Sequence, residues 1–115
     1  MAKINWTSHS LEDIETIAEY IAKDSIRYAE LQVVEFLESV ECLEGFPKTG
    51  RIVPEVGNNS IRELIVGFYR LIYRIKSDQQ IDILTIYHTK RKLTKKEIKK
   101  LRYNLADNLE LQQME

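Results

Sequence analysis

The sequence contains a single cysteine, Cys42, and therefore cannot form an internal disulfide. Because Cys42 continues a helical pattern and precedes Leu43, we expect a buried thiol rather than a nucleophile. No apolar run approaches the length that crosses a membrane, and the N-terminus lacks the apolar core of a signal peptide. These absences favour a cytoplasmic protein that does not enter a membrane.

The size and composition are those of one globular domain. The chain has 115 residues, of which 43% are hydrophobic and 30% are charged, so disorder is not expected. This length supports one modest core but not two domains. We expect a single domain over residues 1–106 and a frayed tail over residues 107–115.

The net charge of −1 conceals a strong asymmetry along the chain. Residues 1–44 have a net charge of −7, residues 45–106 of +9, and residues 107–115 of −3. A basic second half suits a polyanion or an acidic protein partner, whereas the acidic first half repels nucleic acid. A polyanion-binding surface should therefore lie on the second half.

The first half of the sequence predicts a helical hairpin. We expect a strand at residues 3–6, a first helix capped by Ser8 or Ser10, and a second helix capped by Asp24 or Ser25. Apolar residues recur at helical spacing in both helices. Because the break between them is short, the helices should pack antiparallel with their acidic residues facing water.

The second half predicts an antiparallel sheet. Both prolines and two glycines fall within residues 47–57, which predicts an irregular connection. Strand-type runs follow at 61–66, 69–76 and 81–88, with turns short enough for hairpins. Thr94 and Glu97 have capping-box spacing and begin a last helix. The order of elements places the chain in the α+β class.

Strict alternation along the strands predicts one apolar face and one basic face. Arg70, Arg74 and His88 fall on the face opposite the one that packs on the helices, which describes a shallow, positively charged groove. Arg70 lies in the centre of the sheet and needs an anion to satisfy its donors. Arg74 either contributes to this groove or forms a rim ion pair with Asp82.

Several segments, in consistent order over residues 3–93, resemble the RelE/ParE family of toxins from bacterial type II toxin–antitoxin modules. The matching segments are Trp6-Thr7, Pro47-x-x-Gly50-Arg51-x-Val53-Pro54-Glu55, Arg62-Glu63-Leu64, Tyr69-Arg70-Leu71-Ile72-Tyr73-Arg74-Ile75, Ile83-Leu84 and His88-x-x-Arg91-x-Leu93. The resemblance implies an N-terminal strand and a helical hairpin on an antiparallel sheet. It also implies growth arrest, plasmid stabilisation and a cognate antitoxin that wraps and neutralises the toxin.

One branch of this family, the RelE-like toxins, cleaves mRNA in the ribosomal A site. The resemblance implies that Arg70 contacts the scissile phosphate, and Glu55 and His88 resemble the glutamate and histidine (or tyrosine) of other ribonuclease members. RelE, however, has two lysines shortly before this arginine, where this sequence reads Ile61-Arg62-Glu63. As alternatives to catalytic roles, Glu55 pairs with Arg51 or Arg62, and His88 bonds a backbone carbonyl.

The other branch, the ParE-like toxins, inhibits DNA gyrase without known chemistry of its own. The Arg-Glu-Leu and Tyr-Arg-x-x-Tyr-Arg segments and the absence of the lysine pair are closer to this branch. We therefore rank gyrase inhibition ahead of mRNA cleavage. A third alternative is an inactive member that only binds an antitoxin or another peptide along its sheet edge.

The remaining expectations concern binding. The cations expected to contact the target are Arg51, Arg62, Arg74, Arg91 and Lys92. The basic segment 90–102 either follows nucleic-acid phosphates, lies on gyrase, or is a solvated helix face. We expect no metal and no cofactor, and assembly as a homodimer or a toxin–antitoxin hetero-oligomer.

Overall fold

The first strand of the chain, β1 (Lys3–Trp6), joins the sheet beside the last strand, β5 (Gln80–His88), and runs parallel to it. The computed structural model describes residues 1–103. Its sheet has the order β1-β5-β4-β3-β2 and is completed by β2 (Arg51–Ile52), β3 (Ile61–Val66) and β4 (Tyr69–Ser77). The α+β prediction and the antiparallel hairpins of β3, β4 and β5 are confirmed. The parallel β1 makes the sheet mixed, and β2 lies where only an irregular connection was expected.

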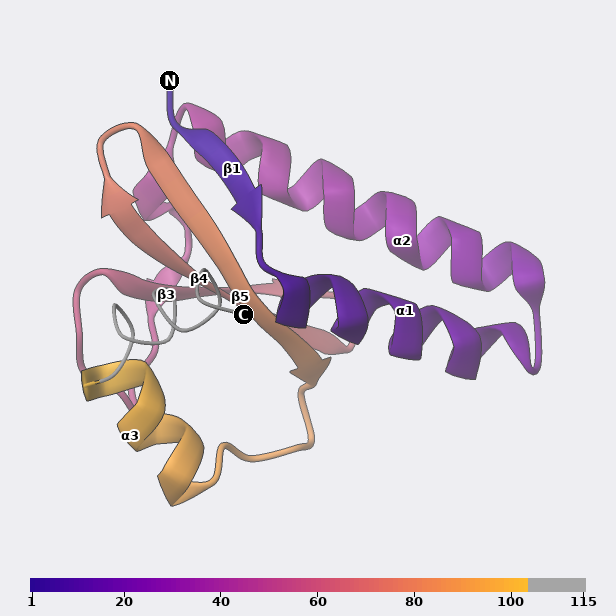
Figure 1. The fold of residues 1–115 in the computed structure, drawn as a ribbon. Helices are drawn as coiled ribbons and strands as arrows, with labels where there is room; N and C mark the ends of the chain where they lie inside the picture. Colours follow the sequence, from indigo (N-terminus) through magenta and orange to yellow (C-terminus); the bar gives the residue numbers. More distant parts are fainter. Residues whose placement is uncertain (104–115) are drawn as a thin grey trace.

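The predicted helical hairpin consists of α1 (Ser8–Ala22) and α2 (Ile26–Glu41), which run side by side along one face of the sheet (Figure 1). The cap of α1 is Thr7 rather than Ser8 or Ser10, because the Thr7 side chain accepts a hydrogen bond from the Ser10 N–H. Ser25 caps α2, as one of the two predicted choices.

The hairpin and the sheet enclose the larger core. Its buried members are Ala2, Phe36, Val40, Leu43, Val66, Leu71, Tyr73, Ile81, Ile83 and Ile86. Cys42 follows α2 in a short 3-10 helix (Cys42–Glu44), and its thiol is exposed, so the prediction of a buried thiol is wrong. The adjacent Leu43 takes the buried position instead.

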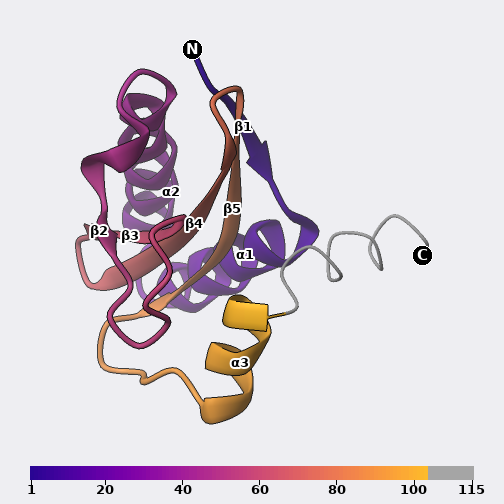
Figure 2. The same ribbon diagram turned by 90° about the vertical axis from the view of Figure 1, so that its left-hand side faces the viewer.

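The opposite face of the sheet is covered as well, so the predicted open groove is not present there. Helix α3 (Lys95–Tyr103) lies on this side, and Figure 2 shows it across the sheet from the hairpin. A second core joins the connection before β3 to the sheet and α3; its buried members are Val53, Val56, Ile61, Ile72 and Tyr87, with Leu84, Leu93, Ile98 and Leu101 packed against them. Burial of this face leaves little room for a solvated basic groove.

An irregularity in β5 changes which side chains share a face. Ile72 pairs with Thr85, but the next residue of β4, Tyr73, pairs with Ile83, so β5 contains one extra residue. Beyond this point the alternation is reversed relative to the prediction. Tyr87 therefore faces the same side as Arg70, and His88 the side of Tyr69 and the helical hairpin.

Asp13 of α1 holds β5 beside this irregularity. Its Oδ2 accepts hydrogen bonds from the Thr85 hydroxyl at 2.7 Å and from the Ile86 N–H at 2.9 Å. The last pair between β1 and β5 joins Trp6 to Ile83, so Asp13 supplies an acceptor just where β1 stops pairing.

Within residues 1–103, no helix has both the length and the apolar character needed to cross a membrane. The predicted tail at residues 107–115 lies outside the described residues.

Gly50 provides a stability test of the contact between this connection and the sheet. Its N–H donates to the Tyr73 hydroxyl at 2.9 Å, and a Cβ added at Gly50 would come to 2.7 Å from that oxygen and into the Glu63 carbonyl. We expect Gly50→Ala to lower the free energy of unfolding by about 1–3 kcal/mol, measured by urea denaturation. Gly45→Ala is the matched control, because no atom lies within 4 Å of its added Cβ. Equal stability of the two variants would contradict the tight contact at Gly50.

Candidate functional site

A row of charged side chains crosses the sheet face opposite the helical hairpin. Register pairs Arg51 of β2 with Glu63 of β3, and Arg70 of β4 with Tyr87 of β5. We define the arginine–glutamate cluster as Arg51, Glu55, Glu63, Arg70, Tyr87, Arg91 and Glu97, which are linked by ion pairs or by ring contacts.

Arg70 is the centre of this cluster. Its Nε donates to Glu63, while Nη1 and Nη2 donate to the two carboxylate oxygens of Glu55 at 2.9 and 3.3 Å. The Glu63 carboxylate also accepts from Arg51 Nε at 2.5 Å. The anion predicted to satisfy Arg70 is thus supplied by the protein's own carboxylates.

Burial makes these ion pairs unequal. The Glu63 side chain is 1% exposed and the Arg70 side chain 11%, whereas Glu55 is 35% and Arg51 67% exposed. Burial alone would lower the pKa of the Arg70 guanidinium, but its hydrogen bonds to Glu55 and Glu63 outweigh this and raise it. Arg70 is therefore always charged. Its Nε is held by the buried Glu63, while its two terminal nitrogens face the exposed Glu55.

Tyr87 lies beneath two guanidinium groups. The Arg70 and Arg91 Cζ atoms are 5.6 and 4.9 Å from the centre of its ring, within cation–π distance. Burial raises the pKa of its hydroxyl to about 12. That hydroxyl is buried and has no hydrogen-bond partner within the described residues.

Of the three residues proposed for ribonuclease chemistry, two meet and one does not. Glu55 contacts Arg70, rather than Arg51 or Arg62 as its alternative role required. His88 lies on the other face, where its ring contacts Phe68 and Tyr69. Its Nδ1 accepts a hydrogen bond from the Lys90 N–H at 3.1 Å, so it does not donate from this atom to a carbonyl. The predicted common face of Arg70 and His88 is therefore wrong.

Arg74 forms the predicted ion pair with Asp82, at 3.1 Å, but the pair is buried and not at a solvated rim. The Asp82 side chain is 0% exposed and also accepts from Asn5 at 3.0 Å. Arg62 binds the connection before β3, donating to the Gly50 carbonyl at 2.9 Å and to the Asn59 carbonyl at 3.0 Å. Both arginines thus have structural contacts within the domain.

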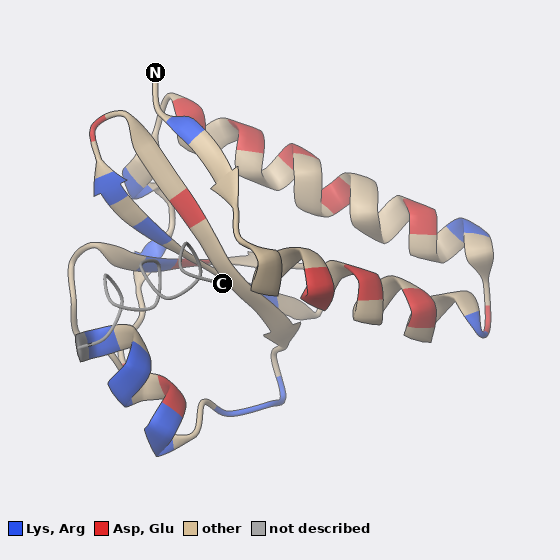
Figure 3. Ribbon diagram, viewed as in Figure 1, with Lys and Arg blue, Asp and Glu red and all other residues tan. Residues whose placement is uncertain are grey.

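The predicted binding cations that remain at the surface are Arg51, Arg91 and Lys92. Arg91 donates to Glu97 of α3 at 2.7 Å, and the predicted capping box of Thr94 and Glu97 is present. In Figure 3 the bases of α3 and the acids of α1 and α2 lie in separate regions. The charge asymmetry of the sequence is therefore also an asymmetry in space.

Sequence reasoning missed Glu63 and Tyr87 as members of the site. Glu63 entered the sequence analysis as part of the Arg-Glu-Leu segment and in the place of a lysine, although a carboxylate at an inward strand position signals a buried partner. Strict alternation, which places His88 on the face of Arg70, places the neighbouring Tyr87 on the helix-facing side instead. No sequence signal marks the extra residue that reverses its direction.

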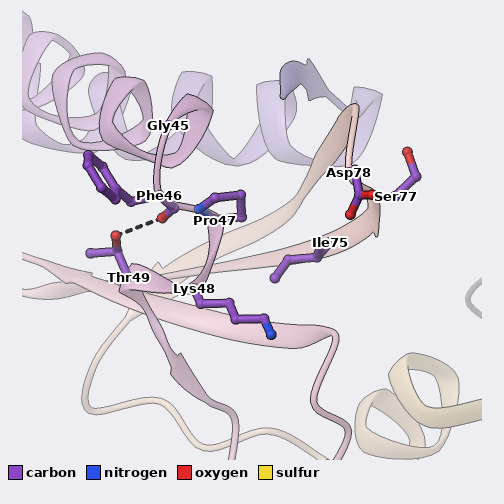
Figure 4. Close-up of a pocket in the computed structure, with 8 residues that line it drawn as sticks. All are labelled: Gly45, Phe46, Pro47, Lys48, Thr49, Ile75, Ser77 and Asp78. Atoms are coloured by element: carbon purple, nitrogen blue, oxygen red, sulfur yellow. Dashed lines mark hydrogen bonds between the residues drawn. The ribbon is translucent and has the colours of Figure 1, made fainter. Parts of the chain in front are cut away.

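A separate pocket of about 540 Å³ lies near the other end of β4. Figure 4 shows it between the connection 45–49 and the side chains of Ile75, Ser77 and Asp78. The Thr49 hydroxyl donates to the Phe46 carbonyl at 2.7 Å and helps to hold this connection. None of the predicted site residues lines the pocket, so the arginine–glutamate cluster remains the candidate site.

Comparisons with known proteins agree with the fold and the motif order. The profile of a family described as "ParE toxin of type II toxin-antitoxin system, parDE" matches residues 4–93. The solved structure of the "Chromosomal ParDE TA system from P. aeruginosa" contains a similar chain, with a TM-score of 0.64 and 23% identity. The match covers 76% of this chain and 96% of that chain, and it shows the fold. No curated protein matches the sequence at a significant level.

The buried carboxylate predicts a large stability effect at Arg70. Among the described residues, Arg70→Ala leaves the buried Glu63 with Arg51 alone as a charged partner, so we expect a loss of about 3 kcal/mol in the free energy of unfolding. Arg91→Ala is the control, because the exposed pair with Glu97 contributes about 1 kcal/mol or less. Urea denaturation measures both, and an Arg70→Ala variant as stable as Arg91→Ala would contradict the buried network.

Acid should weaken the contact between Glu55 and Arg70. The hydrogen bond from Arg70 lowers the pKa of Glu55 below its ordinary value. The contact of Glu55 with Arg70 therefore stabilises the protein fully above the pKa that Glu55 has in the unfolded chain, about 4.3. This stabilisation disappears as the pH falls through the lower pKa that Glu55 has in the folded protein. We expect Glu55→Gln to flatten the decline in unfolding free energy below about pH 4.5 relative to the unsubstituted protein. A decline of unchanged steepness in this variant would refute the assignment.

Proposed function

Because the chain belongs to the family of ParE toxins of type II toxin–antitoxin systems, we propose that it arrests bacterial growth by inhibiting DNA gyrase. We further propose that a cognate antitoxin neutralises it, because the structurally similar chain comes from a ParDE toxin–antitoxin system. Gyrase inhibition requires binding to a protein and no catalytic group. Its target would place the toxin in the cytoplasm.

The observation that carries this proposal is that the protein's own carboxylates engage each of the three nitrogens of the Arg70 guanidinium. A phosphate-cleaving site needs positive charge that is free to stabilise the reacting phosphate. Here Glu63 and Glu55 engage Arg70 Nε, Nη1 and Nη2, and the arginine–glutamate cluster contains as many glutamates as arginines. A charge-balanced surface suits recognition of a protein better than phosphoryl chemistry.

Ribosome-dependent mRNA cleavage is the second candidate, and the contact between Glu55 and Arg70 supports it. In this candidate Glu55 accepts a proton and Arg70 binds the phosphate after the two separate. The histidine of the proposed set faces away from both. Tyr87 is the nearer group, but with a pKa of about 12 it is a weak proton donor at neutral pH.

The exposed cations Arg51, Arg91 and Lys92 are the residues that we propose for contact with the target. Arg62 and Arg74 would support this surface from within, since the first holds the connection before β3 and the second neutralises the buried Asp82. We also propose that the protein assembles with its antitoxin into a hetero-oligomer, whichever target it binds.

Two assays on the same purified protein separate the candidates. We expect it to block supercoiling of relaxed plasmid by gyrase, and to leave mRNA intact on translating ribosomes. Glu55→Gln should keep gyrase inhibition, because this proposal gives Glu55 no chemical role. Untouched supercoiling at high toxin excess would reject the first candidate, and mRNA cleavage that Glu55→Gln abolishes would establish the second.

A further inference from the structure

Glu55 occupies the outer, solvent-facing side of Arg70 as a separate ligand would. We propose that Arg70, Tyr87 and Arg91 form a binding site for one carboxylate of an acidic partner-protein segment, and that Glu55 fills this site in the free toxin. This proposal specifies the chemical group that the site binds, and it does not depend on whether the target is gyrase or the ribosome.

The site is built around a fixed arginine. Glu63, whose side chain is 1% exposed, binds Nε and thereby holds the guanidinium plane in one orientation. The two remaining nitrogens point to Glu55 and contact one oxygen each, at 2.9 and 3.3 Å. This is the paired geometry in which arginine recognises a carboxylate.

Glu55 is the member of the cluster that can leave. It lies in a turn of the connection before β3, and its side chain is 35% exposed. In the described part of the chain, the Glu55 carboxylate has Arg70 as its ion-pair partner. When Glu55 moves away from Arg70, this carboxylate is therefore returned to water. Glu63, in contrast, is shared by two arginines inside the sheet and stays.

Tyr87 supplies an independent sign of a ligand. Its hydroxyl is buried and without a hydrogen-bond partner among residues 1–103, which is uncommon for a buried polar atom. Burial is the largest cause of the raised pKa of this hydroxyl, and the charges of Arg70 and Glu55 also shift that pKa. The hydroxyl therefore lies within electrostatic reach of both residues. The oxygens of Glu55 and Glu63 at Arg70 do not accept from this hydroxyl, so a ligand oxygen that reached it would supply the acceptor it lacks.

The charge balance favours a single carboxylate over a nucleic acid. The cluster pairs Arg51, Arg70 and Arg91 with three glutamates, so a polyanion gains no net attraction from it. A carboxylate that replaces Glu55 preserves the balance. An exposed apolar side chain lies beside Arg70, since Ile65, its cross-strand neighbour, is 58% exposed. Exposed apolar residues around an arginine are typical of protein interfaces.

The test measures binding of a short peptide of alternating leucine and glutamate by titration calorimetry. We expect Glu55→Gln to bind it about tenfold more tightly than the unsubstituted toxin, because the competing carboxylate is gone. Glu38→Gln is the matched control: it makes the same charge change at an exposed position of α2, outside the arginine–glutamate cluster, so its affinity should not change. Thermal melting verifies that each variant is folded.

Two further arms make the result specific. The tighter binding should disappear with the glutamine version of the peptide, and also in Glu55→Gln combined with Arg70→Lys, which keeps the charge but lacks the paired donors. The proposal is overturned if Glu55→Gln binds no more tightly, if the gain persists in either arm, or if the variant prefers a short oligouridylate to the peptide. Because no gyrase or ribosome is present, these outcomes are independent of the proposed target.

Discussion

The buried carboxylate of Glu63 is the contact on which the functional side of the sheet depends. It binds Arg51 of β2 and Arg70 of β4 from its position on β3, and therefore joins three neighbouring strands through one side chain. A carboxylate with 1% exposure is costly unless it is paired and hydrogen-bonded. Both arginines meet this requirement, and in doing so each acquires a fixed direction.

The direction of Arg70 determines what the remaining residues can do. Glu63 binds Arg70 Nε, so the other two nitrogens face the connection before β3, where Glu55 accepts hydrogen bonds from both. The same connection is fastened by Arg62, which bonds the Gly50 carbonyl, and by Arg102, which bonds the carbonyls of Glu55 and Val56. The backbone around Glu55 is thus restrained while its side chain remains partly exposed.

Charge is organised at two scales in this toxin. Over the whole molecule, the acidic α1 and α2 lie across the sheet from the basic α3 (Figures 1 and 3). Within the arginine–glutamate cluster, opposite charges alternate at ion-pair distance and cancel. The long-range asymmetry can orient a charged partner as it approaches, whereas the cancelled cluster discriminates by geometry at contact.

Much of the architecture could be predicted because it follows from local rules. Helical spacing and a short break predicted the hairpin, and turn residues between β-type runs predicted β3, β4 and β5. The order of motifs indicated the toxin family, which the match over residues 4–93 confirms. One wrong prediction was also local: the thiol of Cys42 is exposed because Leu43 takes the core position.

The sequence by itself determined the class of fold, the family and the central place of Arg70. Only the tertiary structure decided which side chains surround that arginine. One extra residue in β5 places Tyr87, rather than His88, beside Arg70. The position of this extra residue depends on the pairing of β5 with β4 and on the contact of β5 with Asp13 of α1. Such a register shift has no local signature, since it arises when separate segments pack together. The closure of Arg70 by Glu63 and Glu55 has the same origin, because these carboxylates are 7 and 15 positions away along the chain.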